Sequence, residues 1–242
     1  YGLSNIIVAI IFTVSFFKKN KKIRPAITFF SKEKVKDLMS LSMAFFGIQL
    51  CMIVIFTTDN LIITNLIGPK EVTNYDIVYK LFQVAITITV IAQDPFWALY
   101  TDAYQKKDFT WIKKTIIRLN KLFLFFVFII VGLFFVAKPL IKFWIQRDLL
   151  IPTSLILLMA IFVLIRVYGT ISMTFLNSIG KVKLQLWLYV FGAIINIPLS
   201  IYFVKQFDLG SSGVILGTIC SIIWLSLILP IQTYKIIKKS HD

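Results

Sequence analysis

Six long apolar segments determine what this chain can fold into. They cover residues 41–67, 77–100, 116–137, 151–176, 184–204 and 214–234. A helix needs about 20 apolar residues to cross the roughly 30 Å hydrocarbon layer of a membrane, and each segment reaches that length. Hydrophobic residues make up 58% of the chain and charged residues only 15%, which excludes a water-soluble globule. The sequence therefore predicts an all-α fold, a polytopic transmembrane helix bundle with six full spans.

A shorter apolar stretch, residues 3–17, precedes these segments and is expected to be one truncated leading span. It begins without basic residues and ends in a basic run, the reverse of a signal peptide. We expect residues 1–17 to be the truncated last helix of a preceding bundle. Residues 18–37 would be a cytoplasmic basic linker, and residues 38–242 the C-terminal six-helix transmembrane bundle. The N-terminal bundle of the same protein, absent from this sequence, is then an expected partner.

The net charge of +15 is explained by the membrane rather than by nucleic acid. Basic residues concentrate on the cytoplasmic side of membrane proteins. When the loop after residues 3–17 is placed inside, the lysines and arginines expected outside are few: Lys70, Lys138, Lys142, Arg147 and Lys205. The pattern predicts a multi-pass protein of the cell inner membrane with a cytoplasmic C-terminus. Its surroundings are membrane lipids, and no nucleic-acid partner is expected.

The connections between the spans are too short to hold a catalytic domain. The only histidine is His241, and Cys51 and Cys220 lie inside apolar runs, so no metal site, cofactor or disulfide is expected. A membrane-embedded polysaccharide polymerase or ligase usually carries a large periplasmic loop, whereas the longest outer loop here is about 138–150. We therefore expect a protein that is not an enzyme.

The cytoplasmic connection 102–115 allows two interpretations. Phe109, Ile112 and Ile116 recur at helical spacing, while lysines such as Lys113 and Lys114 face elsewhere. The simpler interpretation is an elbow between two helices. The other is recognition of anionic lipid by the basic stretch.

Charged residues inside apolar helices are costly and mark functional or structural sites. Such residues here are Asp59, Asp76, Lys80, Asp94 and Arg166. Arg166 lies deep in its segment, and its guanidinium offers planar, forked donors suited to phosphate or carboxylate. It is a candidate substrate-binding residue. The structural alternative is an ion pair with Asp59 or Asp94.

Asp59 follows Thr57 and Thr58 in an otherwise apolar segment, and Asn60 follows it. It is a candidate ion-coupling residue that would bind a proton or sodium, or else the partner of Lys80 in an interhelical ion pair. Asp76 and Lys80 are four residues apart, so a local salt bridge between them is the expected arrangement.

Two proline positions predict kinks. Pro95 follows Asp94, and proline removes a backbone donor inside a helix, so Pro95 is a candidate hinge. Gln93, Asp94 and Trp97 would then face an inward-facing cavity, Gln93 and Trp97 as substrate-binding residues and Asp94 in ion coupling. Pro198, next to Asn196, is a second candidate hinge. Gly210, Gly213 and Gly217 form a small-residue ladder, and its GxxxG portion, Gly213 and Gly217, predicts close helix packing.

Several phrases together resemble the polysaccharide flippases of the multidrug, oligosaccharidyl-lipid and polysaccharide (MOP) exporter superfamily. They are the run 58–68 (TDNLIITNLIG), the run 94–103 (DPFWALYTDA), the turn 177–181 (NSIGK) and residues 196–198 leading to the glycine ladder. The resemblance covers residues 58–218. Its members export O-antigen and teichoic-acid units.

The resemblance implies a transporter of two bundles with a cationic cavity between them, of which this chain would be the C-terminal part. Such a protein would move an undecaprenyl-pyrophosphate-linked oligosaccharide across the cytoplasmic membrane by alternating access. The cavity cations of the family fit Arg166 and Lys80 in kind. A drug or metabolite cation antiporter of the same superfamily is the alternative function, and the polymerase or ligase is a third.

Overall fold

The computed structural model describes residues 2–25 and 31–239, and within those ranges it is helical throughout. The elements are α1 (Gly2–Lys19), the short 3-10 helix η1 (Lys21–Ile23), α2 (Lys32–Leu66), α3 (Pro69–Gln105), α4 (Phe109–Ile145), α5 (Thr153–Ser178), α6 (Lys183–Phe207) and α7 (Ser211–Lys239). Among the described residues, α2 to α7 contain the 6 helices that are long and apolar enough to cross a membrane. The predicted fold class is confirmed.

The chain divides into two compact units, residues 1–42 and residues 43–242. The first unit holds α1, η1 and the first turns of α2. Large apolar side chains of α1 are exposed within it, among them Phe12 at 72%. The basic stretch expected to be a linker is partly helical, because α2 already begins at Lys32. Residues 26–30 of that expected linker, and His241, lie outside the described residues.

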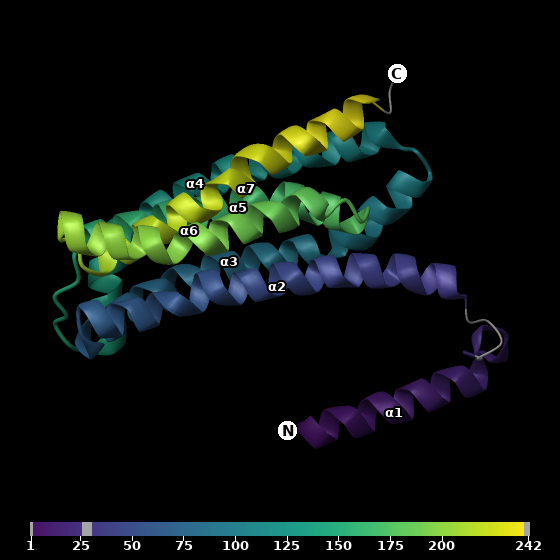
Figure 1. Cartoon of the computed structure of the whole chain (residues 1–242), viewed down its shortest axis with the longest axis horizontal. Coiled ribbons are helices and arrows are strands. Elements are labelled where there is room, and N and C mark those ends of the chain that lie inside the picture. Colours follow the sequence, from purple (N-terminus) through teal and green to yellow (C-terminus); the bar gives the residue numbers. More distant parts are fainter. Residues whose placement is uncertain (1, 26–30, 240–242) are drawn as a thin grey trace. The chain divides into compact units, whose positions relative to one another are not determined.

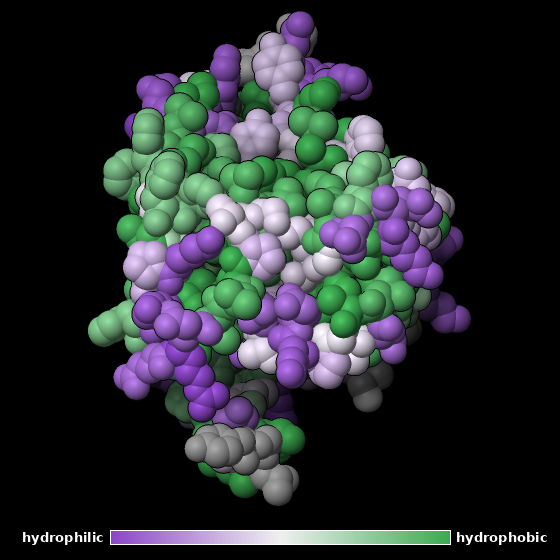
Figure 2. All heavy atoms as spheres, turned by 90° about the vertical axis from the view of Figure 1, so that its left-hand side faces the viewer, coloured by the Kyte–Doolittle hydropathy of each residue, from purple (hydrophilic) through white to green (hydrophobic). Residues whose placement is uncertain are grey.

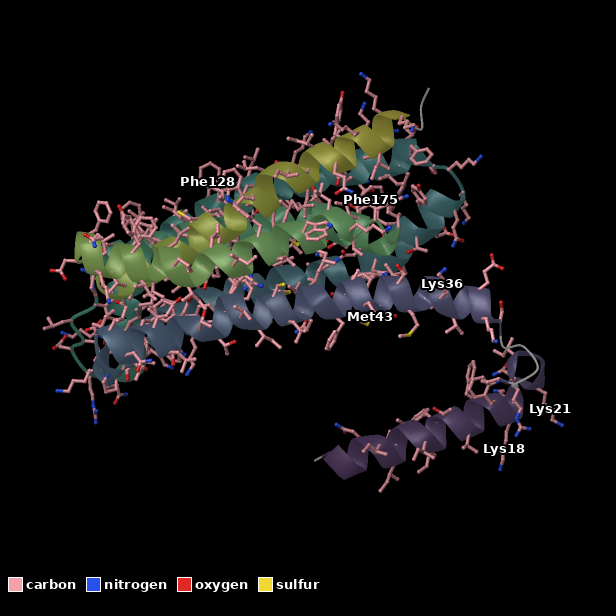
Figure 3. The ribbon with its side chains drawn as sticks, in the orientation of Figure 1. Lys18, Lys21, Lys36, Met43, Phe128 and Phe175 are labelled. Carbon is pink, nitrogen blue, oxygen red and sulfur yellow. The ribbon has the colours of Figure 1, made fainter. Side chains whose placement is uncertain are left out.

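In the second unit, successive helices run antiparallel and α5 lies at the centre of the packing (Figure 1). α3, α4 and α7 all pack against α5, and α6 packs along α7. Phe175 of α5 is fully buried, whereas Phe128 of α4 is 75% exposed on the outer surface, as Figure 3 shows. An exposed apolar surface on a helix of this length is what lipid contact requires.

Glycines bring α6 and α7 into close contact. A Cβ atom on Gly217 would lie 2.6 Å from the backbone nitrogen of Ser200, and one on Gly213 would lie 3.0 Å from the backbone of Phe203. Neither position therefore has room for a side chain. This geometry confirms the helix-packing interpretation of the GxxxG portion, Gly213 and Gly217.

Helices extend beyond the apolar segments at most ends. α3 and α4 are joined by a tight turn at Lys106–Asp108, where the Asp108 carboxylate accepts a hydrogen bond of 2.9 Å from the backbone N–H of Trp111. The connection 102–115 is thus two helix ends with a turn between them, an elbow. α4 runs to Ile145, into the stretch expected to be the outer loop. Figure 2 looks onto the end where α2 meets α3, and shows patches of hydrophilic side chains interspersed with hydrophobic ones.

Candidate functional site

Arg166 is held in the middle of α5 by aromatic contacts. Its guanidinium carbon lies 4.4 Å from the ring centre of Phe56 on α2 and 5.6 Å from that of Phe162, one turn earlier on α5. Such cation–π contacts are worth about 0.5–2 kcal/mol each. They stabilise the positive charge without occupying the N–H groups that point along the plane of the guanidinium.

No carboxylate neutralises Arg166 in the part of the chain that the structure describes. The ion pairs found there are Lys106–Asp102 and Lys142–Asp148, both between exposed side chains. The alternative of an ion pair between Arg166 and Asp59 or Asp94 is therefore wrong. Within the same ranges its side chain donates no hydrogen bond to the protein, so its donors are available to a ligand.

Arg166 lines a cavity of about 380 Å³. Helices α2, α3, α5, α6 and α7 all contribute to the wall. Its polar lining residues are Gln49, Trp97, Arg166, Thr170, Thr174, Asn177, Gln185, Tyr189 and Ser226, and its apolar ones include Phe45, Met52, Phe56, Met173 and Leu225. We call this space the Arg166 cavity.

The polar groups of the Arg166 cavity are only partly paired with one another. The Oδ1 atom of Asn177 and the Oε1 atom of Gln185 are buried, and neither finds a hydrogen-bond partner among the described residues. Buried polar atoms are normally satisfied, so each of these two oxygens still has the capacity to accept a hydrogen bond from a water or a ligand that reaches it. Together with the guanidinium they give the cavity both donors and acceptors.

The structure brings together some of the predicted substrate-binding residues and separates others. Trp97 lines the Arg166 cavity beside Phe45, at 6.1 Å between ring centres. Gln93 does not line the cavity itself. Its Oε1 atom accepts a hydrogen bond of 3.3 Å from the hydroxyl of Thr174, which does line the cavity. Lys80 is exposed and lies outside the cavity, so its role in substrate binding stays a prediction.

The predicted local salt bridge between Asp76 and Lys80 is wrong. Asp76 instead accepts a hydrogen bond of 3.2 Å from the side-chain amide of Asn60, and neither Asp76 nor Lys80 forms an ion pair with a described residue. Lys80 is exposed, and holding its long side chain in a rigid ion pair would cost side-chain entropy.

The predicted hinges lie within unbroken helices. α3 continues through Pro95 and α6 through Pro198, and both prolines are exposed. Asp94 is exposed as well, outside the lining of the Arg166 cavity. The roles of Pro95 and Pro198 as hinges and of Asp94 in ion coupling therefore stay predictions.

Asp59 lies in a second polar centre that ties four helices together. It is 3% exposed, and it accepts hydrogen bonds from the Tyr75 hydroxyl at 2.6 Å and from Thr218 Oγ1 at 3.0 Å. Asn196 donates to Thr218 Oγ1 at 3.1 Å, and Thr58 donates to Asn196 Oδ1 at 3.2 Å. The alternative arrangement, an ion pair between Asp59 and Lys80, does not form.

No positive side chain accompanies the Asp59 carboxylate in the described residues, since its hydrogen-bond partners are all neutral. A buried carboxylate without a cation is costly unless a bound ion or a proton neutralises it. The predicted role of Asp59 in ion coupling, through a bound proton or sodium, stays a prediction. In the described ranges, no group of three or more His, Cys, Asp or Glu side chains comes together as a metal site.

Sequence reasoning missed most of the residues that surround Arg166. Thr170, Thr174 and Asn177 follow Arg166 at intervals of four, four and three positions, which places all of them on one face of α5. That polar stripe is visible in the sequence and could have been found. Gln49, Gln185 and Tyr189 come from other helices, and no local pattern indicates that they meet there.

Comparisons with known proteins give a consistent result. A model of the MatE family matches residues 44–202. No curated protein sequence matches the chain. Solved structures do match in fold, at identities too low to indicate more than the fold itself.

A crystal structure of MATE in complex with MaD3S is 15% identical, with a TM-score of 0.75, and the match covers 97% of this chain and 54% of that one. An outward-facing multidrug resistance MATE family transporter of the MOP superfamily is 15% identical, with a TM-score of 0.69 and coverages of 93% and 52%. An inward-facing structure described in the same words is also 15% identical, with a TM-score of 0.68 and coverages of 87% and 50%. The chain thus spans about half the length of the solved structures that it matches.

Proposed function

The chain belongs to the MatE family, and from that premise we propose that its Arg166 cavity binds the pyrophosphate of a lipid-linked oligosaccharide during export. The proposed substrate is an undecaprenyl-pyrophosphate-linked O-antigen or related surface polysaccharide unit. Alternating access would carry it across the cytoplasmic membrane, in keeping with the inward-facing and outward-facing structures of similar fold.

The observation that carries this proposal is the unpaired guanidinium of Arg166. A pyrophosphate and its hydrophilic sugars cannot enter hydrocarbon at an acceptable cost, so they need a polar passage. Arg166 supplies a fixed positive charge and forked donors at mid-helix depth, where charge-assisted hydrogen bonds to phosphate are strong. Trp97, Asn177 and Gln185 add polar and aromatic surface of the kind that binds sugars. The polyprenyl tail can remain in the lipid.

A drug or metabolite cation antiporter is the second candidate, and the Asp59 centre favours it. A buried carboxylate without a neighbouring cation suits a cationic substrate or coupling ion. The unpaired charge of Arg166 opposes a cationic substrate, since the guanidinium would repel a cation from the Arg166 cavity. We therefore favour the anionic lipid-linked substrate.

The test is complementation by the full-length protein in cells that lack their own polysaccharide flippase. Arg166→Gln should abolish surface display of polysaccharide, and Arg166→Lys should restore part of it, because lysine keeps the charge but not the fork. Lys142→Gln removes one exposed charge and is the matched control. Normal display from correctly inserted Arg166→Gln protein would refute the proposal. Drug resistance that depends on Asp59 but not on Arg166 would favour the antiporter instead.

A further inference from the structure

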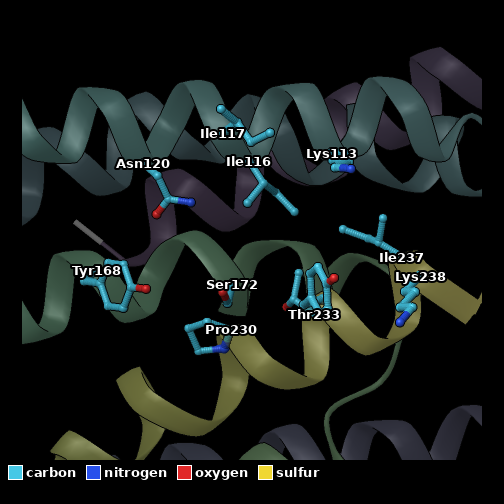
Figure 4. Close-up of a pocket in the computed structure, with 11 residues that line it drawn as sticks. Lys113, Ile116, Ile117, Asn120, Tyr168, Ser172, Pro230, Thr233, Ile237 and Lys238 are labelled. Atoms are coloured by element: carbon cyan, nitrogen blue, oxygen red, sulfur yellow. The ribbon is translucent and has the colours of Figure 1, made fainter.

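A second cavity, of about 580 Å³, lies between α4, α5 and α7 (Figure 4). Its lining residues are Lys113, Ile116, Ile117, Asn120, Tyr168, Ser172, Pro230, Thr233, Tyr234, Ile237 and Lys238. We call it the α4–α7 cleft. On α5 it is lined by Tyr168 and Ser172, whereas the Arg166 cavity is lined by Arg166 and Thr170. Residues two apart point to opposite sides of a helix, so the two cavities lie on opposite faces of α5.

The α4–α7 cleft is amphipathic along its length. Lys113, from the first turns of α4, and Lys238, from the last turn of α7, stand at the same end of the cleft in Figure 4. Neither forms an ion pair within residues 2–25 and 31–239. Ile116, Ile117 and Ile237 supply apolar surface next to them. A ligand that fits this lining has a negative group at one end and a hydrocarbon chain at the other.

Thr233 gives independent evidence that something binds in the cleft. It is 3% exposed, and its hydroxyl has no hydrogen-bond partner among the described residues. An unsatisfied buried hydroxyl costs about 1–3 kcal/mol. A ligand with acceptor oxygens near Thr233 would remove that cost.

The charge around the cleft indicates which leaflet it faces. The turn that holds Lys106 and Lys107 and the turn that holds Lys181 and Lys183 lie at the same end of the bundle as the C-terminal end of α7. Basic ends of membrane helices face the cytoplasm, where the leaflet carries anionic lipids.

We propose that the α4–α7 cleft binds one anionic glycerophospholipid of the inner leaflet. Its phosphate lies between Lys113 and Lys238, its ester oxygens accept from Thr233, and an acyl chain lies along Ile116 and Ile117. A zwitterionic lipid fits less well, because its own ammonium group competes with the lysines for the phosphate. The site is separate from the Arg166 cavity, so it holds a structural or regulatory lipid and not the exported substrate.

Native mass spectrometry of the full-length protein in detergent tests this proposal, with phosphatidylglycerol and phosphatidylcholine as probes. We expect one phosphatidylglycerol to be retained in preference to phosphatidylcholine. The double variant Lys113→Gln/Lys238→Gln should bind phosphatidylglycerol about thirtyfold more weakly, since each lysine near an anionic lipid contributes about 1 kcal/mol. Ile116→Trp, which fills the cleft without changing the charge, should also remove the lipid.

The matched control is Lys114→Gln/Lys239→Gln, which removes the same charge from the same helix ends at positions that do not line the cleft. It should leave the retained lipid in place. An equal loss in the control would mean that the basic surface attracts lipid without a site and would overturn the proposal. So would equal retention of phosphatidylcholine, retention in Ile116→Trp, or displacement by inorganic phosphate at millimolar concentration, which would indicate a simple anion site.

Discussion

Replacing Thr218 by valine should measurably destabilise the bundle, because one hydroxyl holds together the Asp59 centre. Thr218 is fully buried; it lies 3.0 and 3.2 Å from the two oxygens of Asp59 and accepts a hydrogen bond of 3.1 Å from Asn196. Valine has nearly the same shape, so Thr218→Val removes the hydrogen bonds without opening a cavity. The amide of Asn196 loses its acceptor and Asp59 loses one of its two donors.

The magnitude follows from these two losses. Leaving a buried partner unsatisfied costs about 1–3 kcal/mol in water-soluble proteins, and hydrogen bonds between membrane helices average about 0.6 kcal/mol with a maximum near 1.7. We therefore expect the free energy of unfolding to fall by about 2 kcal/mol. For a chain of this size that corresponds to a decrease in Tm of roughly 4–8 °C, and the decrease is smaller in a longer protein, because the entropy of unfolding grows with chain length.

The assay is thermal unfolding of the full-length protein in detergent, followed by size-exclusion chromatography with fluorescence detection. Thr87→Val is the matched control, because the Thr87 hydroxyl is exposed and bonds only to Gln83 of its own helix. Tyr75→Phe removes the other donor to Asp59, so its effect should be non-additive with that of Thr218→Val. A Tm of Thr218→Val within a degree of the control would refute the reasoning.

Three further outcomes follow. Gly217→Ala should lower Tm by several degrees, because the new Cβ atom would meet the backbone of Ser200. Gly132→Ala is the control and should match or exceed the wild-type Tm, because nothing lies within 4 Å of its new Cβ atom. Equal effects of the two substitutions on Tm would contradict the close packing of α6 on α7. Lys142→Gln should change the free energy of unfolding by less than about 0.5 kcal/mol in chemical denaturation, since its ion pair is exposed. Asp59→Asn should abolish export driven by an imposed proton or sodium gradient in proteoliposomes, and undiminished gradient-driven export would remove Asp59 from ion coupling.

Hydropathy predicts where the chain crosses the membrane but not where its helices end. The apolar segment 116–137 lies inside α4, which runs from Phe109 to Ile145. Helices continue into polar sequence because backbone hydrogen bonds and caps decide their ends. Asp108 caps the first turn of α4, and Gln146 ends the helix in a left-handed conformation at φ 55°. Neither signal appears in a hydropathy profile.

The charged residues of the candidate site could be predicted from the sequence, but the residues that contact them could not. Arg166 and Asp59 are recognisable because charges rarely occur in apolar helices. Their environments depend on which helices meet. Asp59 contacts Thr218 across a sequence separation of 159 residues, and Arg166 contacts Phe56 of another helix. The preference of buried charges for ionic partners favoured pairs among the five ionisable residues, but Arg166 contacts aromatic rings and Asp59 contacts neutral hydroxyls instead.

The absence of an ion pair between Arg166 and Asp59 has a physical consequence for the proposed transport cycle. A buried pair would neutralise both charges and leave neither available to a ligand. Instead, Phe56 lies under the guanidinium, and Asp59 follows it three positions later on the same face of α2. Because Phe56 and Asp59 lie one turn apart on α2, a shift of the helix at one of these residues also shifts the other. In the proposed cycle, a shift of α2 on loading of the Asp59 centre would carry Phe56 with it and so reach the guanidinium of Arg166 through one turn of helix.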